Sequence, residues 1–244
     1  MRILAIGAHP DDIENFVGGT LALYAKQGHE IWFAVATRGD IGSPTGTRDE
    51  TAFIRRKEAQ ASCDVLGAKL VWMGYDDEFL FNNLETRMSV IDAIREARPD
   101  IMFILSEADY HPDHRTIGTI ARDARIPASV PLIESRFPFT SIPTTYICDI
   151  FSDDGLAFTP DFYVDVTEVQ SEKQEMLAKH VSQVAWMEAV YQSEMDSDAV
   201  RRDKRRGAEV GVEFAEAFQL LRDYPVTADL DLVPNAILPG RAAS

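Results

Sequence analysis

Apolar runs of strand length alternate with amphipathic stretches of helical period through the first half of the chain. The predicted strands lie at residues 3–8, 31–37, 69–73 and 101–105, and the predicted helices lie at 19–27, 48–66 and 86–97. The second helix stops at Leu66 before Gly67, and the third stops before Arg98 and Pro99, both typical ends of helices. Strands that alternate with helices are typical of βαβ units. The pattern predicts an α/β, Rossmann-like fold of three layers with a mostly parallel sheet.

The pattern changes after residue 125, where four prolines fall within residues 126–143: Pro127, Pro131, Pro138 and Pro143. This segment predicts an irregular, partly apolar excursion. Beyond it we predict strands at 144–151 and 161–166 and helices at 168–191 and 211–221, and the last twenty residues read as a tail on the surface or on a neighbouring subunit. We therefore predict a single domain over 1–244, with a core at 1–125 and an irregular C-terminal elaboration at 126–244.

Composition and charge narrow the class of protein. Of the 244 residues, 45% are apolar and 26% charged, which is typical of an ordinary globular chain. The formal net charge of −16 argues against nucleic-acid binding, which depends on Lys and Arg at phosphates. No apolar run is long enough for a membrane span, and His9-Pro10-Asp11-Asp12 ends the first apolar run before it reaches the length of a signal sequence. Cys63 and Cys148 read as buried thiols of a reducing compartment, so we expect a cytoplasmic protein.

Two polar clusters follow predicted strands at their carboxyl ends. Ala8-His9-Pro10-Asp11-Asp12 ends the first strand, and Asp109-Tyr110-His111-Pro112-Asp113-His114 follows the fourth. With the common strand order 3-2-1-4-5, these two strands are neighbours at the point where the order reverses, and the clusters meet in the crevice where such sheets bind ligands. Imidazole and carboxylate ligands suit zinc, which typically takes three protein ligands and leaves a fourth position to water.

Simpler interpretations exist for each cluster alone. His-Pro-Asp occurs as a turn with a capping aspartate, and Asp113 could cap a helix over 115–125. If Pro112 opens that helix, His114 lies in its first turn and His111 just outside, so only one of the two histidines needs to be a ligand. Capping does not explain why both clusters fall at the same edge of the predicted sheet.

These residues resemble the PIG-L/LmbE-like family of metal-dependent N-deacetylases, whose paired motifs are A-H-P-D-D and H-P-D-H. The resemblance extends along most of the chain, with family counterparts for Gly18-Gly19-Thr20, 37–40, Arg55, Asp77, Ser182-Gln183 and 213–218. Within the family, the first motif looks most like the branch that acts on N-acetylglucosaminyl conjugates of malate in bacillithiol synthesis. One departure is Asp76-Asp77-Glu78, where relatives often have Pro-Asp-Gly.

The resemblance implies a role for each motif residue. His9, Asp12 and His114 would hold Zn2+ or another divalent metal, Asp11 would be the general base, and His111, oriented by Asp113, would stabilise the oxyanion. Arg55 and Asp77 would contact the polar end of the substrate. These residue types suit the chemistry, because zinc lowers the pKa of water and a nearby carboxylate can accept the proton.

Other features carry weaker signals. Gly18-Gly19 lacks the G-x-G-x-x-G spacing of a dinucleotide site and indicates close packing at a helix. The loop at 39–46 either gates the site or merely connects two elements, and His180 reads as a structural residue near the site. The basic run at 201–206 reads as a solvated helix face, a subunit contact or an anion-binding rim.

The predicted function is hydrolysis of the acetamide of an N-acetylated amino sugar, a small-molecule substrate, by a zinc-dependent enzyme that forms a homo-oligomer. The main alternative is a non-catalytic sugar- or nucleotide-binding protein on the same fold, since fold alone does not fix function. An oxidoreductase with a Rossmann fold is disfavoured by the missing glycine fingerprint.

Overall fold

A mixed sheet forms the centre of the molecule, and its parallel half carries the strand order expected from the sequence. The computed structural model describes residues 1–151, 157–184, 186 and 195–240. The strand order is β3-β2-β1-β4-β5-β7-β6-β8. The first five strands in this order run parallel to one another, and the pairs β5–β7, β7–β6 and β6–β8 are antiparallel. The strands are β1 (Arg2–Gly7), β2 (Glu30–Thr37), β3 (Lys69–Tyr75), β4 (Ile101–Ile104), β5 (Thr144–Cys148), β6 (Phe162–Asp165), β7 (Ala215–Leu220) and β8 (Ala236–Ile237).

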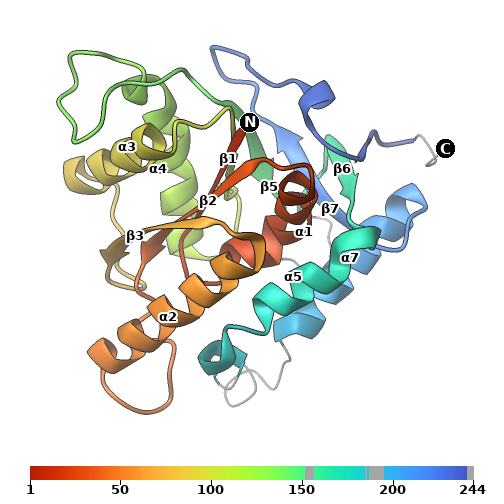
Figure 1. Ribbon diagram of the computed structural model, residues 1–244, viewed down its shortest axis with the longest axis horizontal. Coiled ribbons are helices and arrows are strands. Elements are labelled where there is room, and N and C mark those ends of the chain that lie inside the picture. Colours follow the sequence, from red (N-terminus) through yellow and green to blue (C-terminus); the bar gives the residue numbers. More distant parts are fainter. Residues whose placement is uncertain (152–156, 185, 187–194, 241–244) are drawn as a thin grey trace.

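Helices cover both faces of the sheet and give the three predicted layers (Figure 1). One face carries α3 and α4, which pack together, and the other carries α1, α2, α5 and α7. The helices are α1 (Asp12–Lys26), α2 (Arg48–Leu66), α3 (Leu84–Ala97), α4 (Pro112–Ala128), α5 (Gln170–Leu177) and α7 (Met195–Val210), with short 3-10 turns η1 (Thr167–Val169) and η2 (Leu230–Leu232). The wrapping on two faces follows from right-handed crossovers that reverse direction at β1 and β4.

Helix α1 begins at Asp12, seven residues before the predicted start, so the first polar cluster leads directly into it. The glycine pair lies inside the helix. A Cβ on Gly19 would come within 2.8 Å of Val166, which confirms that Gly19 permits a close approach of neighbouring segments.

Two predictions for the C-terminal half are wrong. Residues 215–220, expected to be helical, form strand β7 between β5 and β6. Their Ala and Glu content favours a helix locally, but burial between two strands overrides this weak preference. The predicted helix over 168–191 is broken near His180, after α5 ends at Leu177, and part of its range lies outside the described residues.

The proline-rich excursion is held together by a buried arginine of α3. Arg95 is 2% exposed and donates hydrogen bonds to five backbone carbonyls, those of Pro127, Ala128, Val130, Ile133 and Phe137. Pro127 and Ala128 end α4, where the last carbonyls lack intrahelical partners, and the other three carbonyls lie in the irregular segment that follows. One guanidinium therefore adds donors to the few backbone amides that also bind these carbonyls.

A buried ion cluster joins the C-terminal elements to α1. Nζ of Lys173, from α5, lies 2.8 Å from Asp203 of α7 and 2.6 Å from Glu216 of β7, and all three side chains are fully buried. Glu216 also accepts hydrogen bonds from the amides of Gly19 and Thr20. The cluster therefore fixes α5, α7 and β7 against the helix that starts at the first polar motif.

The chain's C-terminal segment lies against its own fold. Strand β8 pairs with β6, and the hydroxyls of Tyr24 and Tyr146 donate to the carbonyls of Leu232 and Asp229. Cys63 and Cys148 are free and buried, as expected. Among the described helices, none has the length and apolar character needed to cross a membrane. Association into a homo-oligomer stays a prediction.

Candidate active site

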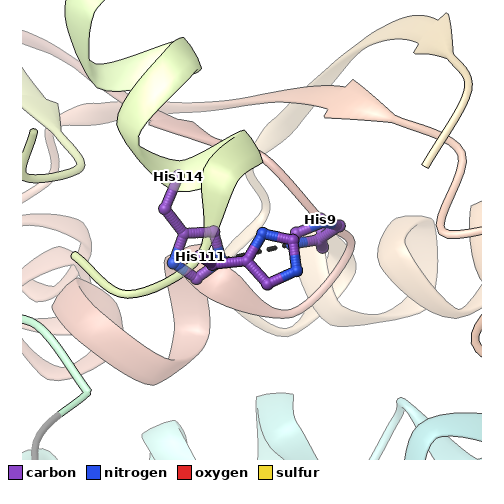
Figure 2. Close-up of side chains that lie close together, drawn as sticks. All are labelled: His9, His111 and His114. Carbon is purple, nitrogen blue, oxygen red and sulfur yellow. Dashed lines mark hydrogen bonds between the residues drawn. The ribbon is translucent and has the colours of Figure 1, made fainter. Parts of the chain in front are cut away.

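The two polar clusters meet where β1 and β4 end. These strands are parallel neighbours, with Ile6 opposite Ile104, so the loops that follow them emerge side by side. His9 comes from the loop after β1, whereas His111 and His114 come from the start of α4, and Figure 2 shows the three imidazoles gathered together. The ring centroid of His9 lies 4.6 Å from that of His111 and 5.2 Å from that of His114.

The side chains of His9, Asp12 and His114 converge as a metal site would require. Nδ1 of His9 lies 3.2 Å from Nε2 of His114, and Oδ1 of Asp12 lies 3.1 Å from the same nitrogen. Ligands of a tetrahedral zinc ion bound at about 2.0 to 2.1 Å are about 3.3 Å apart. Two facing ring nitrogens with a carboxylate oxygen beside them present lone pairs to one point, and this donor set fits a divalent cation.

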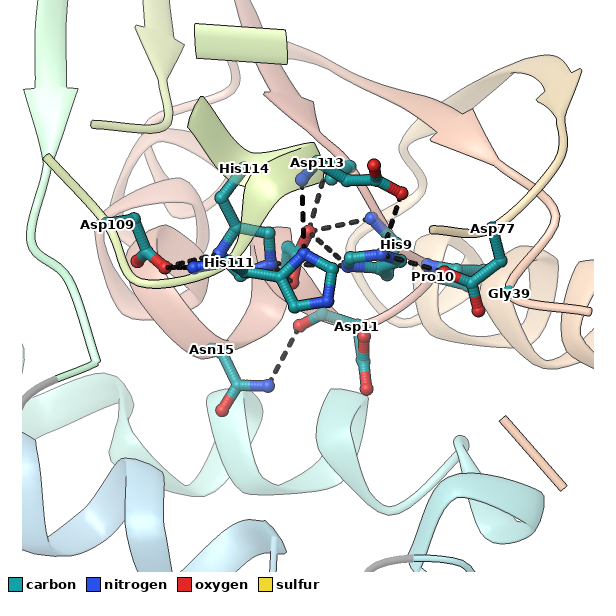
Figure 3. Close-up of polar contacts among 12 residues, drawn as sticks. His9, Pro10, Asp11, Asn15, Gly39, Asp77, Asp109, His111, Asp113 and His114 are labelled. Carbon is teal, nitrogen blue, oxygen red and sulfur yellow. Dashed lines mark hydrogen bonds and ion pairs between the residues drawn. The ribbon is translucent and has the colours of Figure 1, made fainter. Parts of the chain in front are cut away.

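Surrounding groups orient the three side chains. Oδ2 of Asp12 accepts hydrogen bonds from the amides of Ala8 and His9, which leaves Oδ1 directed at His114. Nδ1 of His114 lies 3.1 Å from a carboxylate oxygen of Asp109 (Figure 3). A carboxylate at the far nitrogen is the usual support of a metal-binding histidine, because it fixes the ring orientation and raises the basicity of the ligand nitrogen.

The electrostatics favour positive charge at this point. Burial would raise the pKa of Asp12, yet His114 and His9 hold it well below its ordinary value. Burial would lower the pKa of His114, but Asp12 and Asp109 raise it to about 9. The carboxylates therefore stabilise cationic partners here, and a bound metal ion would supply the same charge.

The histidine cluster contains two other groups of possible ligands: His9 with His111 and His114, and His9 with Asp77 and Asp113, each with ligand atoms within 4.8 Å of one another. Each group includes a side chain whose lone pairs are engaged by the backbone, whereas Asp12 accepts from the backbone only at Oδ2 and keeps Oδ1 beside His114. Nδ1 of His111 accepts from the amide of Asp113, and the carboxylate of Asp113 accepts from the amides of Glu78 and Leu80. The set His9, Asp12 and His114 remains the best candidate.

Asp11 lies beside this group in a strained conformation. Its φ of 142° falls in a region that residues with a side chain rarely adopt, and its carbonyl accepts from the amide and side chain of Asn15. Burial raises the pKa of its carboxyl to about 6, against the effect of Arg55, whose Nη2 lies 3.4 Å away. A carboxyl that titrates close to neutral pH is suited to accept and return a proton.

His111 is arranged as a neutral hydrogen-bond donor. It is the N-cap of α4, and its Nδ1 accepts the amide hydrogen of Asp113 at 3.2 Å. An imidazole that accepts at Nδ1 carries its proton on Nε2 in the neutral form. Burial and the neighbouring His9 and His114 lower its pKa, so the neutral form is favoured. Nε2 lies 3.0 Å from Oε1 of Glu78.

The backbone makes the expected link between Asp113 and His111. Asp113 meets His111 through its backbone amide, because both residues lie at the start of a helix where amides lack intrahelical acceptors. Its carboxylate instead holds the loop at Glu78 and Leu80 and lies 3.6 Å from Nε2 of His9.

The two residues expected to contact substrate lie in the site but are bonded to the protein. Arg55 donates to the carbonyls of Pro10 and Gly39, and a Cβ on Gly39 would come within 2.5 Å of its guanidinium. Asp77 lies 3.0 Å from Nε2 of His9. Arg55 therefore supports the first motif and the 39–46 loop, and Asp77 supports the first histidine.

Below the first motif lies a buried pair. Nε2 of His180 is 2.9 Å from Oε1 of Glu14, which also accepts from the hydroxyl of Ser62, and all three residues are buried. Burial would lower the pKa of His180, but Glu14 and Asp11 raise it above its ordinary value. His180 is therefore held by Glu14 beneath the first motif, and its raised pKa favours the protonated form there.

A cavity of about 930 Å³ opens onto these groups. It is lined by His9, Asp11, Asp12, Arg55, Asp77, His111 and His114, together with residues that the sequence pattern did not assign to the site, including Asn15, Tyr110, Phe151, Gln183, Arg201, Arg202 and Arg205. The arginines come from the basic run on α7. The run is not simply a solvated face, since Arg202, Asp203 and Arg206 are buried.

Comparison with known proteins identifies relatives of this chain. Residues 4–125, half of the chain, match the family described as PIG-L: GlcNAc-PI de-N-acetylase. A probable N-acetyl-alpha-D-glucosaminyl L-malate deacetylase 2 of Bacillus cereus is 29% identical over 76% of this chain and 85% of its own length. A 4-oxalmesaconate hydratase of Pseudomonas putida is 25% identical over 70% of this chain and 69% of its own length.

The fold extends the match beyond the family segment. The structure of N,N'-diacetylchitobiose deacetylase from Pyrococcus horikoshii superposes with a TM-score of 0.78 at 26% identity, covering 95% of this chain and 88% of that one. The matched segment contains both polar motifs and the strands that bring them together. The chain therefore belongs to the PIG-L family of GlcNAc-PI de-N-acetylase-like proteins.

Proposed function

We propose that this protein is a zinc-dependent N-deacetylase that removes the acetyl group of an N-acetylated amino sugar. The observation that carries the proposal is the convergence, in one cavity, of a candidate metal triad, a carboxyl with a pKa near 6 and a neutral imidazole donor. Deacetylases among its relatives support the reaction class.

Each group has a defined task in this proposal. His9, Asp12 and His114 would hold the metal, which when bound supplies Lewis acidity and lowers the pKa of water to about 7. Asp11 takes the proton of the attacking water. His111 donates from Nε2 to the oxyanion that develops on the acetamide oxygen, a type of contact whose loss costs about 3 to 4 kcal/mol in other hydrolases. Asp11 then returns the proton to the departing nitrogen, which yields acetate and a free amine.

The test is acetate release from a panel of N-acetylglucosaminides, measured with zinc and after chelation, together with the metal content of the purified protein. We expect about one metal ion per chain and turnover that chelation abolishes and zinc restores. Binding of sugars without acetate release by the metal-loaded protein would instead favour the non-catalytic alternative. Hydration of an unsaturated acid without deacetylation would place the chain with its hydratase relative.

A further inference from the structure

A cationic wall faces the catalytic cluster across the cavity. Arg201, Arg202 and Arg205 of α7 line the same cavity as His9 and Asp11. The protein as a whole carries a formal net charge of −16. A concentration of arginines on the wall of a pocket in an acidic protein creates a local potential that attracts anions.

Arg202 lies close to the reacting end of this cavity. Its guanidinium is 4.6 Å from the ring centroid of Phe16 and 5.3 Å from that of Phe151. The same two rings lie 6.0 and 6.3 Å from the ring of His114. Arg202 is therefore separated from a candidate metal ligand by a single layer of aromatic rings, which also fix the plane of its guanidinium.

The two terminal nitrogens of the Arg202 guanidinium differ in their hydrogen bonding. Nη2 donates to the carbonyl of Asn15, whereas Nη1 is buried without a hydrogen-bond partner among the described residues. The residue is only 6% exposed. A buried donor without an acceptor is unfavourable, and a carboxylate or phosphate oxygen in the cavity would satisfy it.

The other cations of the cavity differ in their bonding. Arg201 forms an ion pair with Asp198, and Arg55 is bonded to the loop carbonyls and to Asp11 on the catalytic side. Arg201 and Arg205 thus accompany Arg202 on this wall, with the charge of Arg201 balanced in part by Asp198, which also lines the cavity, while Arg55 serves the general base.

We propose that the α7 wall, formed by Arg201, Arg202 and Arg205, binds an anionic group on the part of the substrate attached to the amino sugar. The substrate is then an acidic conjugate, carrying a carboxylate or a phosphate, and not a neutral oligosaccharide. This inference rests on the proposed deacetylase function.

The experiment compares kcat/KM for three N-acetylglucosamine compounds in the metal-loaded enzyme: the neutral methyl glycoside, a glycoside of a hydroxy acid and the 1-phosphate. The variants are Arg202→Lys, the double variant Arg201→Gln/Arg205→Gln, and the control Arg136→Gln, whose side chain is 79% exposed and does not line the cavity. Preference for the carboxylate or the phosphate identifies which anion is bound.

We expect at least a tenfold preference for one acidic compound. Both α7 variants should lower the ratio of acidic to neutral kcat/KM by about 10- to 100-fold, mainly through KM, as expected for a lost hydrogen bond to a charged group. Arg136→Gln should leave the ratio unchanged. The double variant retains Arg202 and its packing, so it tests the wall even if Arg202→Lys does not fold.

Two failures are distinguishable. Equal turnover of neutral and acidic compounds, with ratios insensitive to the α7 variants, overturns the anion-binding wall and leaves deacetylation standing. If none of the three compounds releases acetate, the proposed function fails. Calorimetric binding of the acidic compounds to wild type and to the double variant then still decides whether the wall binds anions.

Discussion

Oε1 of Glu78 lies 3.0 Å from Nε2 of His111, the nitrogen that we assign to the oxyanion. The backbone of Glu78 has a φ of 68°, a conformation that favours glycine. Its amide is held by the carboxylate of Asp113. The side chain therefore occupies the donor of His111 at the cost of local backbone strain.

Replacing Glu78 by glycine should relieve this strain. We expect Glu78→Gly to raise the free energy of unfolding by about 1 kcal/mol over Glu78→Ala, which keeps a Cβ at positive φ. Both variants remove the carboxylate, so both should lower KM by leaving the His111 donor open to substrate. Urea unfolding and steady-state kinetics measure the two effects. Equal stability of the Gly and Ala variants would contradict the strain argument.

Substitutions of the two neighbouring aspartates of the first motif should have different effects on metal binding and turnover. Asp11→Asn removes the base but no ligand, so the metal should stay bound while turnover falls by roughly 10²- to 10⁴-fold. Asp12→Ala removes a ligand and should lower metal affinity first, with partial rescue by excess zinc. Metal content and turnover are measured on the same samples. If Asp11→Asn empties the site and Asp12→Ala leaves it filled, the two roles are reversed.

The pH profile should report Asp11. Because burial raises the pKa of its carboxyl to about 6, the basic carboxylate form becomes populated above that pH, and kcat/KM should rise as pH increases through about 6. Arg55 lowers this pKa, so Arg55→Gln should move the acid limb to higher pH. Arg56→Gln, a change at the exposed neighbour, is the control. An acid limb that does not move in Arg55→Gln would exclude Asp11 as its origin.

The buried ion cluster should dominate the stability of the C-terminal half. Lys173→Met leaves Asp203 and Glu216 buried without their cation and should cost about 3 to 5 kcal/mol in the free energy of unfolding. Lys179→Met, which breaks a pair with Glu175 at the surface, should cost less than about 1 kcal/mol. Urea titration compares the two. Similar losses for both would show that the cluster contributes no more than a surface pair.

The parallel half of the fold and the meeting of the two motifs could be predicted from the sequence, because apolar periodicity sets strand positions and chain order sets the switch point. The C-terminal half could not. Strand β7 has a helix-forming composition, and only its neighbours β5 and β6 make it a strand.

The site shows the same division between local and tertiary information. The motif indicated which side chains gather, but not that Asp113 would contact His111 through its backbone amide, since that contact depends on where α4 starts. For the basic run on α7 the sequence left three interpretations open, an anion-binding rim among them, and could not place the run at the cavity, because its position depends on the packing of α7 against β6, β7 and α5.

The contacts of Arg95 have a consequence for how the segment at 127–137 can vary. All five of its acceptors are backbone carbonyls, which every amino acid provides, proline included. Five of the bonds that hold this segment thus come from one residue of α3, and the segment's side chains can change without loss of these five bonds, although Ser135 and Arg136 also bind Asp92 of the same helix. Relatives with a different sequence here could keep the same course of the chain, provided that the arginine remains.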